Sequence, residues 1–288
     1  MYNPQTVRPG AALELIETGI DWITLTSRAD DHRQPEFRQA AWHACEVQRN
    51  VTKEIMTPWH WQGYKGWRVT GLAWGSRTGG DIVIASGATA NRYWRLFNRV
   101  STNVSRLDMQ VTVTLDRPYV SLTTDYYHEL AALGKRKGAH IQNTEGGTTV
   151  YIGSRKSDQF GRVYDKGIEA GLTCGPGKVY RYEVEFKAKR AKHTTDKLFT
   201  LACHQRPLYR HVLSTVWHWF NDRELRPIFK PSQDSTPVLV QLEARDESAE
   251  RTLRWLKVQV RPSVERLRNT RELDVLRALG LNYLLLDD

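Results

Sequence analysis

Two stretches of the sequence, residues 20–115 and 119–187, share a loose order of strand-like and helix-like patterns, and this repetition constrains the fold most. Strands are expected where apolar and polar residues alternate or β-forming residues cluster, and helices where apolar residues recur at helical spacing. The expected strands lie at residues 20–26, 67–72, 81–86, 104–115, 148–152, 160–164 and 179–187, and the expected helices at 33–56, 89–100 and 122–133. The chain is therefore predicted to contain two related α+β halves.

The connections between these runs favour an antiparallel arrangement. Short turns join the expected strands as often as helices do, and the residues between 67–72 and 81–86 include Gly79-Gly80, which predicts a hairpin. The expected fold class is α+β, with antiparallel sheets and flanking helices. From about residue 195 the pattern becomes helical, at 208–220 and at 248–269, where Pro262 should introduce a kink. We expect one domain over 1–195 and a mainly helical C-terminal region over 196–288.

The charge balance points to a polyanionic partner. Lys and Arg number 42 against 32 Asp and Glu, which gives a formal charge of +10 and a pI near 9.6. Such a surplus favours nucleic acid or an anionic membrane surface. No stretch approaches the roughly 18 apolar residues that a spanning helix needs, and residues 1–10 lack the apolar core of a signal peptide. The 3 scattered cysteines argue against a disulfide framework or a thiolate zinc site. We therefore expect a cytoplasmic protein with no membrane partner.

A tyrosine lies between two cations in Arg162-Val-Tyr164-Asp-Lys166. If residues 160–166 form a strand, alternation places Arg162, Tyr164 and Lys166 on one face. Positive charge there would favour the phenolate, which is the better nucleophile, and would hold a phosphate diester. The alternative is a half-buried strand tyrosine flanked by surface charges.

A possible phosphate-binding turn precedes this tyrosine. The segment Gly153-Ser-Arg155-Lys156-Ser157 offers backbone N–H groups, hydroxyls and cations. It lacks the Gly-Lys-Ser/Thr ending of an ATP-binding loop, so nucleotide hydrolysis is not predicted.

Carboxylates occur within two other strand-like runs. Asp108 lies inside the apolar run 104–115, and Glu183 and Glu185 share one face of the run 179–187. A carboxylate that points out of a central strand needs a compensating partner, and a hard divalent cation is one candidate. An oxygen-rich site of this kind suits Mg²⁺ or Mn²⁺, which would polarise a phosphate as a Lewis acid. The alternative is a buried salt bridge from Asp108 or Glu183 to a nearby arginine.

Several ordered motifs resemble the replication initiation factor family. They are Tyr151-Ile-Gly-Ser-Arg-Lys-Ser157, then Arg162-Val-Tyr-Asp-Lys-Gly167, then Arg181-Tyr-Glu-Val-Glu-Phe-Lys187. Arg106-Leu-Asp108 and the segments 63–66 and 86–88 fit the same pattern. The resemblance extends over about residues 20–190. The family includes trans-acting initiators of rolling-circle plasmids, replication proteins of filamentous phages, and related relaxases of conjugative elements.

The resemblance implies a metal-dependent endonuclease that nicks one DNA strand at an origin. A tyrosine would become linked to the 5′ phosphate, and the freed 3′ hydroxyl would prime synthesis. It assigns Tyr164 as the nucleophile with Arg162 and Lys166 beside it, and Tyr151 as a reserve. The implied metal ligands, for Mg²⁺ or Mn²⁺, are Asp108, Glu183 and Glu185. The residues expected to contact DNA are Arg106, Arg155, Lys156 and Ser157.

The expected partners follow from the same resemblance. Origin DNA would be bound single-stranded or as a hairpin in a bacterial host cell, and a host helicase would unwind it, because no helicase motif is visible. A homodimer is also possible. None of the 9 histidines has His-x-His spacing, so a metal site would depend on carboxylates. Two alternatives stay open, a conjugative relaxase with the same chemistry and a non-enzymatic DNA-binding regulator that would need neither Tyr164 nor a metal.

Overall fold

The computed structural model describes residues 13–100, 103–115, 131–132, 139–144, 147–169, 179–203 and 207–225, together with residues 227, 229, 231, 237 and 238. The chain divides into two compact units, Met1–Val240 and Gln241–Asp288. The second unit lies outside the described residues, as do nearly all of the helix expected at 122–133 and the whole helix expected at 248–269. The functional division expected near residue 195 stays a prediction.

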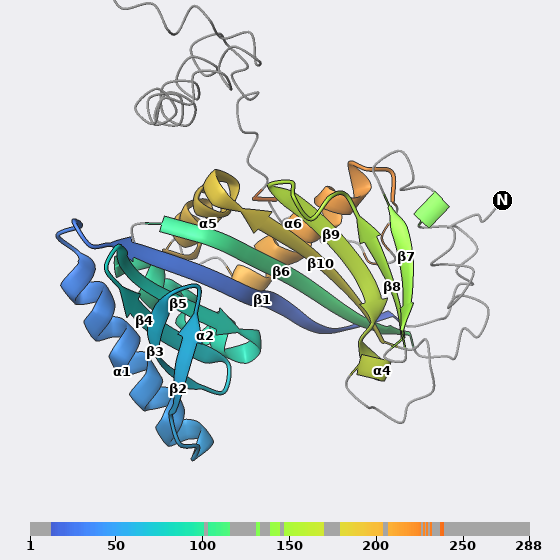
Figure 1. Cartoon of the computed structure of the whole chain (residues 1–288). Helices are drawn as coiled ribbons and strands as arrows, with labels where there is room; N and C mark the ends of the chain where they lie inside the picture. Colours follow the sequence, from blue (N-terminus) through green and yellow to red (C-terminus); the bar gives the residue numbers. More distant parts are fainter. Residues whose placement is uncertain are drawn as a thin grey trace, which may run out of the picture. The chain divides into compact units, whose positions relative to one another are not determined.

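Within the first unit, ten antiparallel strands form one sheet in the order β2-β3-β4-β5-β1-β6-β10-β9-β8-β7 (Figure 1). The strands are β1 (Leu13–Arg28), β2 (Thr57–Trp61), β3 (Tyr64–Val69), β4 (Leu72–Arg77), β5 (Gly80–Ser86), β6 (Asn103–Leu115), β7 (His140–Thr144), β8 (Gly147–Ile152), β9 (Gln159–Asp165) and β10 (Val179–Lys187). The helices are α1 (Gln34–Thr52), α2 (Gly87–Val100), α4 (Lys166–Glu169), α5 (Ala188–Cys203) and α6 (Leu208–Asn221). This architecture confirms the α+β class with an antiparallel sheet and flanking helices.

The strand order consists of two similar halves that meet where β1 pairs with β6. In each half the first strand lies at the centre of the sheet, β1 in one half and β6 in the other. The next strand in sequence lies at the sheet edge, and the three after it fill the space back to the central strand. The four strands are β2 to β5 in the first half and β7 to β10 in the second. A helix follows each returning strand directly, and both junctions have positive φ, 55° at Gly87 and 48° at Ala188. Two related halves are thus present in the sheet, but their boundary differs from the prediction. The strand expected to end the first half, at residues 104–115, is β6, and it is the first strand of the second half.

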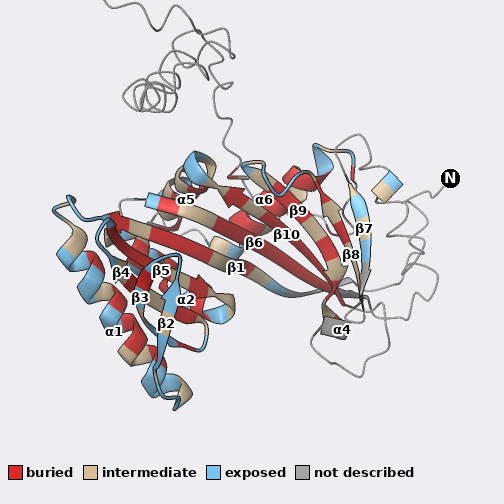
Figure 2. Ribbon diagram, in the orientation of Figure 1, coloured by how far each residue is buried: buried red, intermediate tan, exposed pale blue. Residues whose placement is uncertain are grey.

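The hydrophobic core lies between one face of the sheet and its helices (Figure 2). Strand β6 shows the pattern well, because Leu107, Met109, Val111 and Val113 are all fully buried. Alternate residues of a strand point to opposite faces, so these four side chains face the helices. Trp94 of α2 and Trp219 of α6 are the largest side chains of this core, and each stabilises the fold by roughly the 1.5–3 kcal/mol expected for burial of a large apolar side chain.

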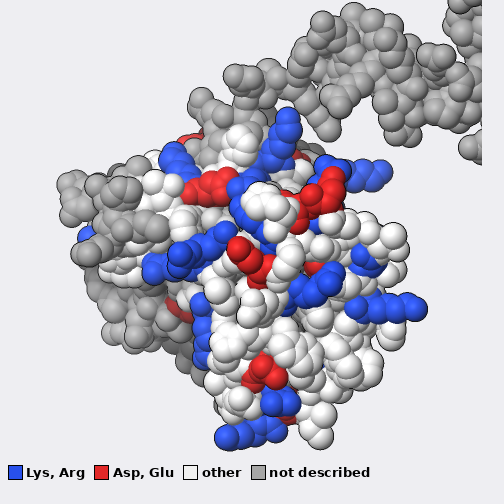
Figure 3. Space-filling view, turned by 90° about the vertical axis from the view of Figure 1, so that its left-hand side faces the viewer, with Lys and Arg blue, Asp and Glu red and all other residues white. Residues whose placement is uncertain are grey.

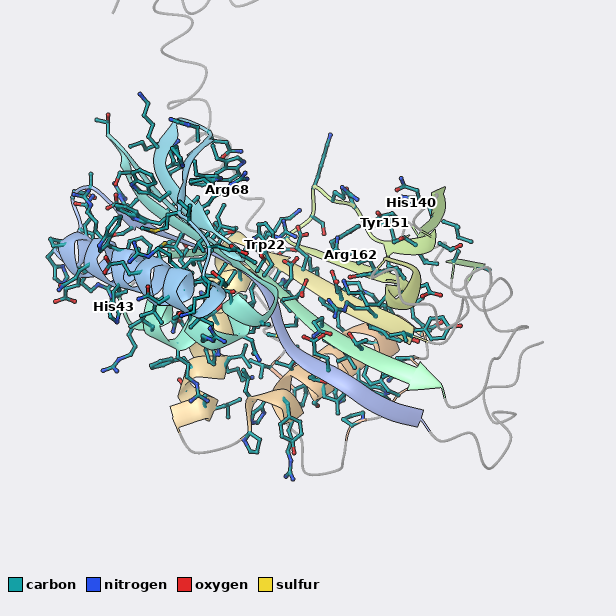
Figure 4. All side chains as sticks on the ribbon, turned by 90° about the horizontal axis from the view of Figure 1, so that it is seen from below. Trp22, His43, Arg68, His140, Tyr151 and Arg162 are labelled. Carbon is teal, nitrogen blue, oxygen red and sulfur yellow. The ribbon has the colours of Figure 1, made fainter. Side chains whose placement is uncertain are left out.

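The intervening residues of the same strands lie on the opposite face, here called the site face. It carries Arg106 and Asp108 of β6 and the corresponding polar residues of β10 and β9. Figure 4 shows Trp22, Arg162, Tyr151 and His140 in a row along this face, while α5 and α6 lie beneath the other. The alternation of polar and apolar residues therefore separates a helix-covered core from a face rich in functional groups.

Some predicted boundaries were wrong. The run 67–72 is not one strand, because the chain turns at Thr70-Gly71, where Gly71 has φ +75°, so that β3 ends at Val69 and β4 begins at Leu72. The helix expected to reach residue 56 ends at Thr52, since Lys53 adopts a left-handed conformation. Strands β2 and β7 and helix α4 were not predicted, and α5 begins before residue 195. No described helix combines the length and apolar character needed to cross a bilayer.

Candidate active site

Three neighbouring strands, in the order β6-β10-β9, bring the predicted residues together on the site face. Their register places Glu185 beside Asp108 and Glu183 beside Arg162. Because side chains two residues apart on a strand share a face, Glu183 and Glu185 both point to this side. Most of the predicted catalytic and metal-binding side chains therefore lie on three adjacent strands.

The hydroxyl of Tyr164 donates a hydrogen bond to Oε1 of Glu183 across 2.5 Å. Arg162 forms an ion pair with Oε2 of the same carboxylate. The register partner of Tyr164 on β10 is Arg181, so Tyr164 and Glu183 are diagonal neighbours across two strands, a spacing that long side chains span. One carboxylate that is only 2% exposed thus contacts both the tyrosine and the arginine.

Burial sets the proton affinity of this carboxylate. It raises the pKa of Glu183 above its ordinary value, although Arg162 and the hydrogen bonds from Tyr164 and Arg162 oppose the shift. Burial alone would lower the pKa of Arg162, but the Glu183 and Asp108 carboxylates outweigh it and keep the guanidinium firmly charged. A carboxylate with a raised pKa is a stronger base, so Glu183 is suited to accept the proton of Tyr164.

A second ionic group lies beside the first. Arg106 donates to both oxygens of Asp108, from Nε at 2.8 Å and from Nη2 at 2.5 Å. The same Nη2 lies 3.1 Å from Glu185, and Nζ of Lys187 lies 2.8 Å from the other oxygen of Glu185. Burial raises the pKa of Asp108 to about 7, with Glu185 and Glu183 adding to the shift and Arg106 opposing it.

The predicted metal ligands are close together but have other partners. Asp108, Glu183 and Glu185 each form an ion pair with arginine or lysine, so the salt-bridge alternative holds for Asp108 and Glu183. Across the part of the chain that the structure describes, no group of three or more His, Cys, Asp or Glu side chains is arranged to hold a metal ion. The donor atoms are still carboxylate oxygens, which suit hard cations, and a divalent ion at this site stays a prediction.

Lys166 is placed differently from the prediction. Strand β9 ends at Asp165, and Lys166 is the first residue of α4, so it does not continue the alternation of Arg162 and Tyr164. Its Nζ nevertheless lies 6.0 Å from the centre of the Tyr164 ring, and the guanidinium carbon of Arg162 lies 5.8 Å from it. Arg162 on β9 and Lys166 on α4 therefore both lie near the Tyr164 ring.

The turn between β8 and β9 uses two of its amides internally. The Ser157 N–H donates to the Ser154 carbonyl at 2.9 Å, and the Lys156 N–H donates to the Ser154 hydroxyl at 3.2 Å. These two amides close the turn, so its contribution to anion binding would come mainly from cations. Arg155 is exposed, and its guanidinium carbon lies 4.9 Å from the centre of the Tyr151 ring.

A groove of about 490 Å³ crosses the join between the two halves of the sheet. Residues lining it include Trp22, Trp61 and Ile84 from the first half and Arg106, Arg162 and Glu185 from the second. Trp22 and Trp61 are two of the 7 tryptophans in the first third of the chain. Their interleaving with Arg and Lys allows two interpretations from the sequence, surfaces on which unpaired bases stack or residues that pack the core and the sheet. Figure 3 shows Lys and Arg side chains spread over one side of the molecule with Asp and Glu among them, so charges of both signs are interspersed on this side.

One comparison with known proteins shows the family of this chain. A sequence profile of the replication initiation factor family matches residues 124–279, more than half of the chain. No curated protein sequence matches it. Among solved structures, the chain is similar to the rolling circle replication initiator protein from Geobacillus stearothermophilus, with a TM-score of 0.49 and 18% identity over 70% of this chain and 83% of that chain.

Proposed function

The chain belongs to the replication initiation factor family, and on that premise we propose that it nicks one DNA strand at a rolling-circle origin with Tyr164 as the nucleophile. The observation that carries the proposal is the hydrogen bond from Tyr164 to the buried carboxylate of Glu183, with Arg162 on the other oxygen. Nucleophile and base within hydrogen-bond reach, with the base oriented by a third group, are the usual arrangement for covalent catalysis.

The proposed reaction is a transesterification at phosphorus. The Tyr164 oxygen attacks the scissile phosphate as its proton passes to Oε1 of Glu183. A bond forms between the tyrosine oxygen and phosphorus, and the bond from phosphorus to the 3′ oxygen breaks. The 3′ oxygen takes a proton from water and becomes the primer hydroxyl, while the 5′ phosphate stays on the tyrosine. The stored ester bond allows later rejoining without a nucleotide cofactor.

Arg162 and Lys166 would offset the charge that develops on the phosphate. The Arg162 side chain keeps about a third of its surface accessible, 32%, although it is paired with Glu183. Fixed cations aimed at developing charge in a partly dry site stabilise a transition state more than they would in water. Arg106, Arg155, Lys156 and Ser157 are the groups proposed to contact neighbouring phosphates.

We also propose Mg²⁺ or Mn²⁺ as the cofactor, on the chemistry of the donor set. Asp108 and Glu185 would hold the ion, since they supply carboxylate oxygens on one face of adjacent strands. Glu183, the third ligand predicted from the sequence, has both of its oxygens engaged with Tyr164 and Arg162. When bound, the ion would polarise the scissile phosphate as a Lewis acid. Nicking in EDTA at the rate seen with Mn²⁺ would remove the metal from this proposal.

The partners proposed from the family are origin DNA, bound single-stranded or as a hairpin, and a host helicase that unwinds it. A homodimer stays a prediction. A conjugative relaxase would use the same residues at a transfer origin, so the two uses differ in the DNA sequence and in the partner proteins. A non-enzymatic regulator would bind DNA with no need for the bond between Tyr164 and Glu183.

The test is covalent capture, which does not require the origin to be known beforehand. The full chain is incubated with a random single-stranded oligonucleotide library and Mn²⁺, and DNA that stays attached in SDS is sequenced. Mass spectrometry then locates the modified residue. We expect one sequence family on Tyr164 and no adduct with Tyr164→Phe. If the protein binds DNA but forms no adduct with any metal ion or without one, the non-enzymatic DNA-binding regulator becomes the better-supported function.

A further inference from the structure

We infer that the groove between the two halves binds one or two unpaired nucleotides beside the scissile phosphate, with Trp61 and Trp22 as the surfaces on which their bases stack. The inference rests on the proposed function and adds a binding site for the single-stranded substrate. It assigns the stacking of bases to the first half of the sheet and the reaction to the second half.

The groove is continuous with the nicking site. Arg162 lines the groove and also pairs with Glu183, the carboxylate that accepts the hydrogen bond of Tyr164. Trp22 on β1 is the register partner of Asp108 on β6, and the Arg106 guanidinium carbon lies 4.8 Å from the Trp22 ring centre. A strand whose phosphate reaches Tyr164 would therefore place its next nucleotides in the groove.

The two halves carry different chemistry at equivalent positions. The junctions at Gly87 and Ala188 align the halves, because each joins a returning strand to its helix with positive φ. Ile84 lies three residues before Gly87, and Glu185 lies three residues before Ala188, so the two positions are equivalent. In the sheet, Ile84 pairs with Thr24 on β1. Glu185 pairs with Asp108 on β6. An apolar residue and a hydroxyl thus replace two carboxylates in the first half.

The nucleophile is also absent from the first half. Gly80 corresponds to Arg181 by the same count. Gly80 pairs with Arg77 on β4, whereas Arg181 pairs with Tyr164 on β9. The first half therefore retains the same sheet framework without the nucleophile or the carboxylates at these positions, and it contributes Trp22, Trp61 and Ile84 to the groove.

These aromatic groups have the shape of a stacking platform. The rings of Trp59 and Trp61 on β2 are stacked with centres 6.2 Å apart and planes 22° from parallel. Trp59 lies over Gly75, where an added Cβ would be 3.1 Å from the ring, so the absence of a side chain at Gly75 makes room for the ring. Trp61 keeps 40% of its surface exposed, which leaves area for a base.

The chemistry of the groove favours an unpaired strand over a duplex. In a duplex the flat faces of the bases are covered by their neighbours, whereas a single strand can present them to aromatic rings. Arg106, Arg155 and Lys187 line the same groove and would contact the backbone phosphates. The groove volume of about 490 Å³ lies within the range of roughly 300–1,000 Å³ that is usual for ligand sites.

The chain provides a matched control for the test. Trp67 on β3 is 39% exposed, almost equal to Trp61. Its register partner Trp74 contacts Trp42 of helix α1, so Trp67 points to the helix side of the sheet. Trp61→Ala and Trp67→Ala therefore remove the same side chain with similar exposure from opposite faces.

The experiment measures equilibrium binding of the full chain by fluorescence anisotropy. The probes are a labelled oligo-dT, an abasic oligonucleotide with the same number of phosphates, and a blunt duplex. For oligo-dT we expect Trp61→Ala to weaken binding roughly 5- to 150-fold, the range for loss of one base–aromatic stack, and Trp61→Phe to retain part of the affinity. The abasic and duplex probes should bind all variants alike, and Trp67→Ala should behave like the wild type.

Equal affinity of Trp61→Ala and wild type for oligo-dT would overturn the inference, provided that thermal unfolding shows both to be folded. Equal loss on the abasic probe would also overturn it, because the effect would then not involve bases. Covalent capture on Tyr164, run with the same variants, tests the proposed function separately. If an adduct forms on Tyr164 but Trp61→Ala binds oligo-dT as the wild type does, only the proposed base-stacking site is rejected. If Trp61→Ala weakens oligo-dT binding but no adduct forms, only the proposed nicking reaction is rejected.

Discussion

The Tyr164 hydroxyl donates to Oε1 of Glu183 at 2.5 Å, while Arg162 pairs with the second oxygen of the same carboxylate. The three side chains come from two adjacent strands, β9 and β10, so the rigid sheet sets their relative positions. Arg162 orients the carboxylate and leaves one oxygen for the tyrosine proton. This relationship makes Glu183 as important to the proposed reaction as the tyrosine.

Replacing Glu183 with glutamine should slow covalent capture while leaving DNA affinity nearly unchanged. Glutamine preserves the shape of the side chain but cannot accept the tyrosine proton, and loss of a general base typically costs about 10²- to 10⁴-fold in rate. The rate of the variant should then rise steeply with pH, because an unassisted tyrosine, with a pKa near 10, must ionise alone. Rates are measured by single-turnover adduct formation, and an unchanged rate and pH profile would mean that Glu183 only supports the fold.

Tyr151→Phe should leave the adduct yield unaltered, although Tyr151 is the reserve nucleophile. Its ring stacks between His140 at 5.1 Å and Phe160 at 5.7 Å, and phenylalanine keeps this packing while it removes the hydroxyl. Mass spectrometry of adducts from Tyr164→Phe and from the double variant, which carries both Tyr151→Phe and Tyr164→Phe, checks the assignment of Tyr164 as the nucleophile. If Tyr164→Phe still forms an adduct that the double variant lacks, Tyr151 acts as a second nucleophile.

Gly161→Ala should destabilise the fold. A Cβ at this buried position would lie 2.3 and 2.4 Å from two ring carbons of Trp219, and overpacking of a core commonly costs about 1–3 kcal/mol. Gly79→Ala is the control, because no heavy atom lies within 4 Å of its added Cβ. Urea denaturation compares the free energies of unfolding, and equal stability of the two variants would show that α6 shifts freely to admit the methyl group.

Strand alternation was sufficient to predict which side chains share a face. A period of two is intrinsic to the strand, so the groupings of Arg162 with Tyr164 and of Glu183 with Glu185 followed from the sequence. The register between strands is set by packing across the whole sheet. For that reason the sequence did not predict that Tyr164 contacts Glu183 instead of Glu185.

The missed strands have local causes. Strand β2 contains Pro58, which lowers strand propensity but is tolerated at a sheet edge, and β2 is an edge strand. Strand β7 is the opposite edge and is short and polar. The groove was also beyond local patterns, because Trp22 and Trp61 lie on separate strands and meet the charged residues only after the two halves join.

The contribution of Asp108 to stability should depend on pH. Asp108 is 1% exposed, and burial raises its pKa from 3.8 to about 7. The folded protein therefore retains a proton that the unfolded chain releases between these two values. It follows that the stabilising contribution of this carboxyl group is fully present below the unfolded pKa and is lost as the pH rises through about 7.

Asp108→Asn removes this titration while keeping the size of the side chain. The free energy of unfolding of the variant, relative to the wild type, should therefore increase between about pH 5 and about pH 8. One pKa unit corresponds to about 1.4 kcal/mol, and we expect a change of at least that size. Urea denaturation in EDTA at several pH values measures it without interference from bound metal. A difference that stays constant over this range would mean that Arg106 keeps Asp108 ionised throughout and that its pKa is close to the ordinary value.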